Sequence, residues 1–128
     1  SAAAQADVEP LISSARRKMA EKGLLASDLP SPARELEREA ATAMEGGDFA
    51  RARFAADQLV ATVDSLKVDK GFLMAKIGRL NSVVKGAKLA EDTRKQVDDL
   101  FRDATADYGD GQFVAANGKL NRIYGLIR

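Results

Sequence analysis

The chain has 128 residues, 45% of them hydrophobic, with 20 basic and 19 acidic residues and a formal net charge of +1. A charge this close to zero gives no field that would draw the protein to nucleic acid. The sequence contains no cysteine, histidine or tryptophan, which excludes disulfides, thiolate chemistry, most zinc sites and the commonest general base at neutral pH.

The first seven residues, 1–7, are small and polar, and we expect them to form a flexible N-terminal segment. Alanine-rich sequence is also typical of what remains after cleavage of a signal peptide or lipoprotein signal. We therefore expect a bacterial protein of the periplasm or cell envelope, with the cytoplasm as the alternative, and any lipid anchor would lie outside this sequence. No stretch reaches the roughly 20 apolar residues of a membrane span.

The first predicted helix covers 8–22 and presents apolar residues on one side. Pro10 is expected in its first turn, where a missing N–H costs nothing, and Gly23 is expected to end it in the left-handed conformation.

The next two helices are delimited by caps and glycines. Ser31 is expected as an N-cap followed by Pro32 at the first helical position, and this second helix should end at 46–47. Asp48 is expected to cap the third helix, which extends to residue 66. The spacing of its apolar residues is typical of an antiparallel helical seam, and they are Phe49, Ala52, Ala56, Leu59, Val63 and Leu66.

Three further helices are predicted in the second half. Asp69 is expected to cap the fourth, which ends at Gly86. The fifth starts near Glu91 and ends at Gly109, and Asp110 is expected to cap the sixth, which runs to the end of the chain.

The two halves of the chain repeat each other. Leu36, Arg38, Ala40, Gly47, Phe49 and Ala52 recur 64 positions later as Leu100, Arg102, Ala104, Gly111, Phe113 and Ala116. Such repetition is typical of one supersecondary unit used twice, because each copy needs a neighbour to cover its apolar face. Since the loops are short, we expect an all-α domain over 8–128, built of six antiparallel helices as two related three-helix units, 8–66 and 69–128.

The pattern Gly-x-Phe-x-x-Ala occupies 47–52 and again 111–116. It resembles the inter-helix turn of a tetratricopeptide hairpin, in which a glycine turns the chain, an aromatic residue wedges between the helices and an alanine lets them close. The resemblance covers about half of the chain. The period departs from the family's value of about 34 residues, and the family's Trp and closing Pro positions are not filled. The resemblance implies that a concave helical face binds a protein or peptide.

Four polar residues align on the last predicted helix. Asn117, Asn121, Tyr124 and Arg128 fall at i, i+4, i+7 and i+11, so that they could hydrogen-bond an extended peptide backbone or a carboxylate. The alternative is a polar outer face, or asparagines that satisfy neighbouring loop carbonyls.

Lys76 and Arg79, with Lys85 and Lys88 beyond them, suggest a second candidate site. They could form an anion-binding edge on the fourth helix. The alternative is an ordinary solvated face, and no glycine-rich strand-to-helix loop accompanies them as a phosphate site would require.

Acidic residues converge at the last predicted turn. Asp103, Asp107 and Asp110 could hold a weak Ca²⁺ or Mg²⁺ site, but the segment lacks the length and the closing Glu of an EF-hand loop. We expect no metal and no cofactor. Nothing resembles a sugar cleft for paired carboxylates, so we also expect no enzymatic activity.

These observations favour a non-enzymatic helical-repeat module that binds a protein or peptide, as a monomer or weak homodimer, with no nucleic-acid partner. One alternative is a structural or assembly subunit that associates with copies of itself. Another is a carrier of a small ligand or lipid, with a cavity between the two units lined by Phe49, Phe54, Phe72 and Phe101.

Overall fold

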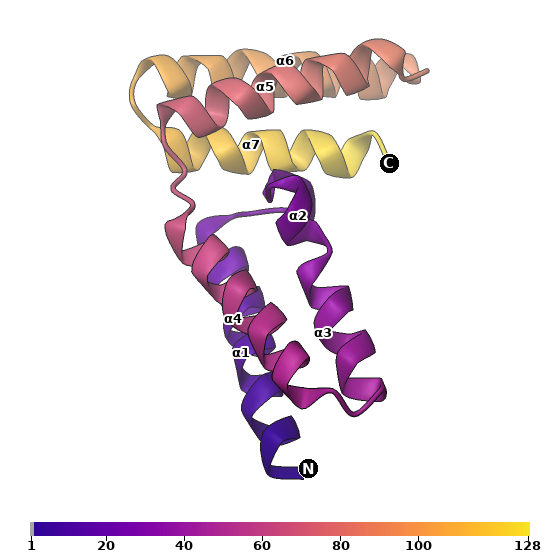
Figure 1. Ribbon diagram of the computed structural model, residues 1–128. Helices are drawn as coiled ribbons and strands as arrows, with labels where there is room; N and C mark the ends of the chain where they lie inside the picture. The colour runs from indigo at the N-terminus through magenta and orange to yellow at the C-terminus, as the bar shows by residue number, and fades with distance from the viewer. Residues whose placement is uncertain (1) are drawn as a thin grey trace. The chain divides into compact units, whose positions relative to one another are not determined.

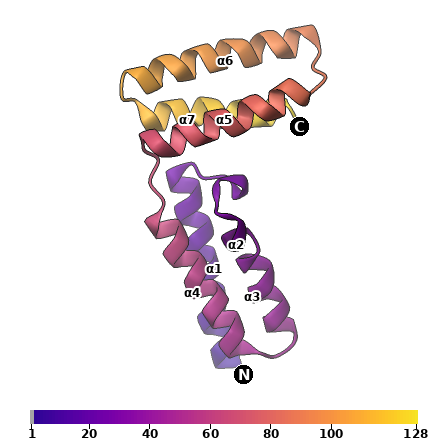
Figure 2. The same ribbon diagram turned by 45° about the horizontal axis from the view of Figure 1, so that its top comes forward.

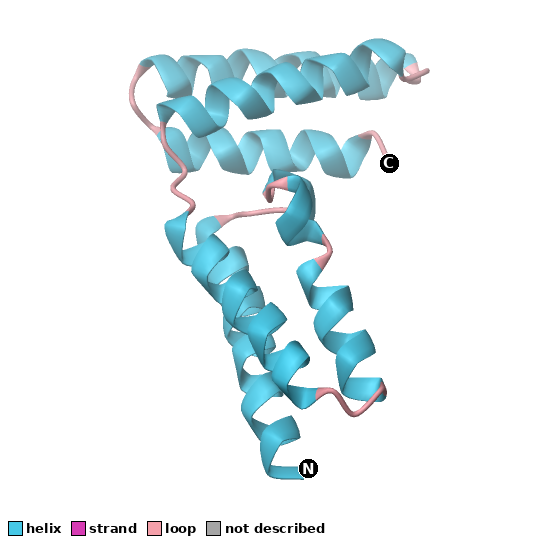
Figure 3. Ribbon diagram, viewed as in Figure 1, coloured by secondary structure: helices cyan, strands magenta, loops and turns pink. Residues whose placement is uncertain are grey.

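A computed structural model describes the backbone of residues 2–128 and the side chains of residues 6–128. Every regular element in this part of the chain is helical (Figure 3), which confirms the predicted all-α class. Contacts divide the chain into two compact units, Ser1–Leu66 and Lys67–Arg128, here named unit 1 and unit 2.

Each unit is built of three long helices (Figures 1 and 2). Unit 1 contains α1 (Ala2–Lys22), a 3₁₀ turn (Ala26–Asp28), the short α2 (Ser31–Arg34), α3 (Leu36–Glu45) and α4 (Phe49–Ser65). Unit 2 contains α5 (Lys70–Gly86), α6 (Glu91–Gly109) and α7 (Phe113–Leu126). In both, the last helix contacts the other two: α4 contacts α1 and α3, and α7 contacts α5 and α6.

Helix α1 begins earlier than the sequence indicated. The residues 2–7, expected to be flexible, form its first turns, and Pro10 consequently lies inside the helix rather than in its first turn. Ser1 lies outside the described residues. Alanine, the best helix former, dominates this extension. Val8 is fully buried against Ala43 and Ala52, whereas Pro10 is exposed, so its ring faces water.

The second predicted helix is divided. Ser31 is not its N-cap: Pro30 takes that position in an extended conformation, with no side-chain capping bond. Proline suits this position because its fixed φ fits it and a missing N–H costs nothing at the start of a helix, so α2 begins one residue earlier than predicted. Glu35 then separates α2 from α3.

Gly47 and Gly111 turn the chain at the two corresponding hairpins. Their φ angles are 76° and 74°. In the first turn the N–H of Asp48 donates to the carbonyl of Ala43 at 2.9 Å. In the second, the N–H of Gln112 donates to the carbonyl of Asp107 at 2.8 Å. Because donors and acceptors are both 64 positions apart, the sequence repeat corresponds to a repeated Schellman turn.

The capping predictions have mixed outcomes. Asp48 caps α4 by accepting from the N–H of Arg51 at 3.1 Å, and Asp69 caps α5 by accepting from the N–H of Phe72 at 2.9 Å, as predicted. Asp110 does not cap α7, because it is the C-cap of α6. The Schellman turn places the following helix two residues later than the sequence suggested.

The two cores differ in the size of their side chains. In unit 1, small residues dominate the α1–α3–α4 contact: Val8, Ala43, Ala52 and Ala56 are buried, with Leu11, Ile12 and Met44 packed around them. Leucines dominate the core of unit 2, with Leu73, Leu80, Leu100 and Leu120 among its buried members. Phe49 and Phe113 begin α4 and α7 and are both half-buried.

Candidate functional site

Lys76 and the asparagines of α7 form one buried cluster in unit 2. Lys76 is 0% exposed, and its Nζ donates to Oδ1 of Asn117 at 2.7 Å and to Oδ1 of Asn121 at 2.6 Å. The same Nζ lies 5.5 Å from the ring centroid of Phe72 and 6.0 Å from that of Tyr124. Amide oxygens and aromatic faces both favour a cation, so the surroundings suit the ammonium group.

The sequence-predicted polar stripe is therefore not an open binding face. Asn117 is 2% exposed, and Asn121 and Tyr124 are partly buried. Only Arg128, beyond the end of α7, is exposed. The structure brings the first three together around Lys76, where they satisfy a buried charge that would otherwise be costly.

The predicted basic edge of α5 is also divided. Lys76 is buried, whereas Arg79 is exposed, so they do not share an accessible surface. The signal was available in the sequence. The spacing of Leu73, Lys76 and Leu80 is three and then four residues, which places the lysine on the buried stripe of the helix.

Asp103 and Asp107, near the α6–α7 turn, have protein partners. Asp107 forms an ion pair with Lys119 of α7, and Asp103 pairs with Arg102 at 3.3 Å. Among the side chains that the structure describes, no group of three or more His, Cys, Asp or Glu could hold a metal ion.

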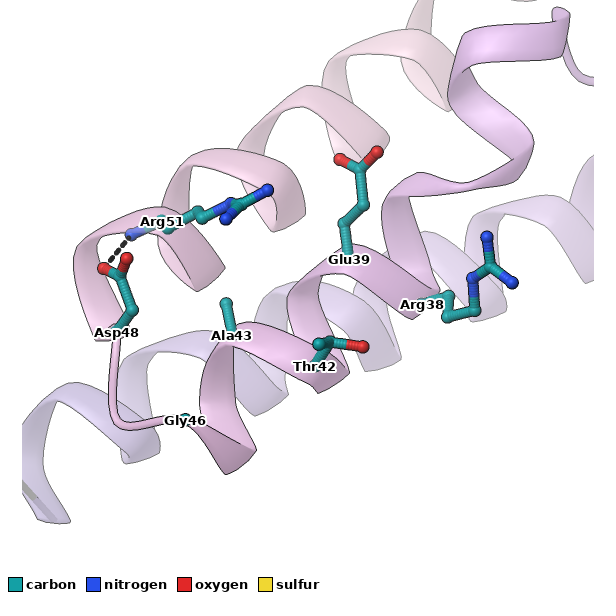
Figure 4. A pocket seen from close by; sticks show the side chains of 7 residues that line it. All are labelled: Arg38, Glu39, Thr42, Ala43, Gly46, Asp48 and Arg51. Carbon is teal, nitrogen blue, oxygen red and sulfur yellow. Dashed lines mark hydrogen bonds between the residues drawn. The ribbon is translucent and has the colours of Figure 1, made fainter.

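A hollow of about 570 Å³ lies between α3 and α4 in unit 1 (Figure 4). Arg51 and Glu39 reach into it from the two helices, while the carboxylate of Asp48 accepts a hydrogen bond from the backbone N–H of Arg51. Arg38 already pairs with Glu35. The lining thus carries two guanidinium groups and two carboxylates, and this balance favours neither an anionic nor a cationic ligand.

A second hollow, of about 490 Å³, lies between α1 and α3 and is here named the α1–α3 groove. Its apolar lining comes from Val8, Ile12, Ala41 and Met44. Ile12 and Met44 are half-buried and Ala41 is exposed, so apolar atoms line an accessible surface. Pockets of this size and character accept side chains of a ligand or partner.

The two ends of the α1–α3 groove differ in charge. At one end Arg16 of α1 pairs with Glu37 of α3, which ties the helices together across the groove. At the other end lie Glu9 and Glu45. Glu45 is the last residue of α3, whose final turn carries no basic residue, so the negative end of the helix dipole adds to the carboxylate. This open end therefore attracts cations.

The hollow of unit 2 offers less. It measures about 430 Å³, lies between α6 and α7, and has Asp99, Asp103 and Arg122 in its lining. Arg102 already binds both of these carboxylates at 3.3 Å. Phe54, expected to line an apolar cavity, is 66% exposed.

Comparison with protein-family models, with curated protein sequences and with solved structures finds no match to this chain. Among the described residues, no helix combines the length and apolarity needed to cross a bilayer.

Proposed function

We propose that this chain is a non-enzymatic helical-repeat module that binds a protein or peptide through the α1–α3 groove. The observation that carries the proposal is the combination of an apolar floor with an acidic open end. Ile12 and Met44 offer accessible apolar surface beside Glu9 and Glu45. A partner that suits it presents an apolar side chain with a lysine or arginine one helical turn away.

The apolar floor and the acidic end of the groove have different roles in binding. Burying one large aliphatic side chain supplies about 1.5–3 kcal/mol, whereas exposed charge pairs at the rim contribute about 1 kcal/mol or less and mainly steer the encounter. Met44 suits such a groove because its unbranched, polarizable side chain adapts to different shapes. We therefore expect affinity to follow the apolar anchor and the on-rate to follow the basic residues.

A pair of synthetic helical peptides tests this proposal. One carries leucines at i and i+4 flanked by lysines, and the other replaces each lysine with glutamate. Methyl NMR of the full chain should show that the lysine peptide shifts the signals of Ile12 and Met44, while the glutamate peptide leaves them unchanged. Shifts confined to other residues would contradict the proposal.

A groove-blocking variant sharpens the test. Ala41 lines the groove and is exposed, so Ala41→Gln fills space there without disturbing the core. Ala61 is an exposed alanine of α4 outside the groove, and Ala61→Gln is the matched control. The first variant should lose binding of the lysine peptide and the second should retain it. Equal binding by both would exclude the groove as the site.

A further inference from the structure

Met74 is an exposed apolar side chain on α5 of unit 2, 62% accessible. Its neighbours on the same helix face are Gly71, Ala75 and Gly78, all exposed. A Cβ built on Gly78 meets nothing within 4 Å, so this side of the helix is open. Because Gly71 and Gly78 have no side chain and that of Ala75 is small, Met74 projects as an apolar knob that another helix pair can approach closely.

Basic residues accompany this knob. Lys70 lies one helical turn before Met74 and is exposed, and Lys67 precedes the helix and is also exposed. An apolar anchor with lysine one turn away is the pattern that the α1–α3 groove favours, since that groove combines an apolar floor with the carboxylates of Glu9 and Glu45.

The net charges of the two units are also opposite in sign, as are those of the groove and of the residues beside Met74. Residues 1–66 carry eight basic and eleven acidic side chains, a formal net charge of −3, whereas residues 67–128 carry twelve basic and eight acidic, a net charge of +4. Unit 1 of one molecule therefore attracts unit 2 of another at low ionic strength.

We propose that the occupant of the α1–α3 groove is a second copy of this chain, which inserts Met74 between Ile12 and Met44 and places Lys70 against Glu9 and Glu45. This inference rests on the proposed function, because it uses the same groove. The contact is heterologous: each copy offers one groove and one knob. Such a contact continues from copy to copy into rings or longer assemblies.

Sedimentation analysis of the full chain tests the self-association. The average mass should rise above the 13.7 kDa of one chain with concentration, and added salt should oppose the rise by screening the charges. Met74→Gln should weaken association at least about tenfold, because the contact then no longer buries the apolar side chain of Met74. Val114 is the matched control, because it is 77% exposed on α7, and Val114→Gln should leave association unchanged.

A charge exchange identifies the two surfaces. In the double variant Glu9→Lys with Glu45→Lys the groove becomes basic, while the residue beside Met74 remains the basic Lys70. In Lys70→Glu the groove remains acidic, while the residue beside Met74 becomes acidic. Each should associate at least about tenfold more weakly than the natural chain by itself, and a mixture of the two should recover association. The substitutions suit the fold, since Lys70→Glu puts a carboxylate at a helix N-terminus and Glu45→Lys puts an ammonium group at a helix C-terminus.

Three results would overturn the inference: a constant mass at every concentration, equal effects of Met74→Gln and Val114→Gln, or no recovery in the mixture. The outcome is separable from that of the proposed function. If the chain stays monomeric while the lysine peptide shifts Ile12 and Met44, the groove binds a different partner and only the second copy is excluded. If neither the peptide nor a second copy binds, both proposals fail.

Discussion

Gly47 and Gly111, 64 positions apart, hold the same left-handed backbone conformation at the same point of two helical hairpins. A Cβ at either position meets nothing within 4 Å, so crowding is not the reason for glycine. The reason is conformational, because the left-handed region costs L-residues about 1–2 kcal/mol. Gly47→Ala and Gly111→Ala should each lower the free energy of unfolding by about that amount, as measured by urea denaturation.

Gly118 is the matched control for this prediction. It lies inside α7, and a Cβ there also meets nothing within 4 Å. Because alanine is about 1 kcal/mol better than glycine in a helix interior, Gly118→Ala should raise the free energy of unfolding. A similar sign for Gly111→Ala and Gly118→Ala would contradict the assignment of the repeated turn.

Lys76 should be a structural residue of unit 2 rather than a binding residue. Lys76→Met keeps most of the volume but removes the charged donor to Asn117 and Asn121, and hydrogen bonds to a charged group contribute about 1.5–3 kcal/mol. Urea denaturation of the variant should show a loss in that range. Lys85→Met, on an exposed lysine of the same helix, should change stability by less than about 0.5 kcal/mol.

A double-mutant cycle separates the contact from other effects of removing the lysine. Lys76→Met, Asn117→Ala and their combination should deviate from additivity by at least about 0.5 kcal/mol, as residues in one hydrogen-bond network do. Additive losses would mean that the lysine and the amide stabilise the unit independently.

Local patterns predicted the helices well because caps and apolar stripes act within a few residues. Asp48, Asp69 and Gly23 occupy the conformations that their residue types favour. The site was harder to predict, since Asn117 is bound by Lys76, which lies 41 positions away in the sequence. The spacing of Lys76 within its leucine stripe indicated burial, but no local pattern names the partner across the interface.

The same limit applies to the α1–α3 groove. Ile12 and Met44 are each packed against the core of unit 1 on one side. The other side of each residue remains accessible because of the distance between α1 and α3. Both helices contact α4, and this contact sets that distance. Packing geometry of this kind is not encoded in the periodicity of any one helix.

Lys22 should stabilise unit 1 by closing the end of α4. Its Nζ donates to the carbonyls of Val63 at 2.7 Å, Asp64 at 3.1 Å and Leu66 at 2.8 Å. They lie at the C-terminal end of α4, where carbonyls lack a full set of helical donors, although that of Val63 also accepts from the N–H of Leu66 at 3.3 Å. A cation there also suits the helix dipole. Hydrogen bonds to a charged group contribute about 1.5–3 kcal/mol, so Lys22→Met should lower the thermal midpoint clearly.

Lys18 provides the comparison, one turn earlier on α1. Its Nζ binds the carboxylate of Asp64 at 2.8 Å, with the two side chains 32% and 50% exposed, and ion pairs that solvent reaches contribute about 1 kcal/mol or less. Lys18→Met should therefore have a small effect that salt reduces further, whereas the effect of Lys22→Met should persist in salt. Equal decreases of the thermal midpoint for the two variants would show that the carbonyl contacts of Lys22 stabilise the unit no more than the ion pair of Lys18 does.

Tyr108 should tolerate, and even benefit from, removal of its hydroxyl. The oxygen is buried and has no hydrogen-bond partner within the described residues, while the ring lies 6.0 Å from that of Phe113. Since an unsatisfied buried polar group costs about 1–3 kcal/mol, Tyr108→Phe should leave the free energy of unfolding unchanged or raise it by about 1 kcal/mol in urea denaturation. Tyr108→Ala removes the ring as well and should destabilise unit 2. Both variants lack the hydroxyl, but only Tyr108→Ala also lacks the ring. Equal destabilisation by the two variants would therefore contradict the prediction and mean that the hydroxyl has a hydrogen-bond partner in solution.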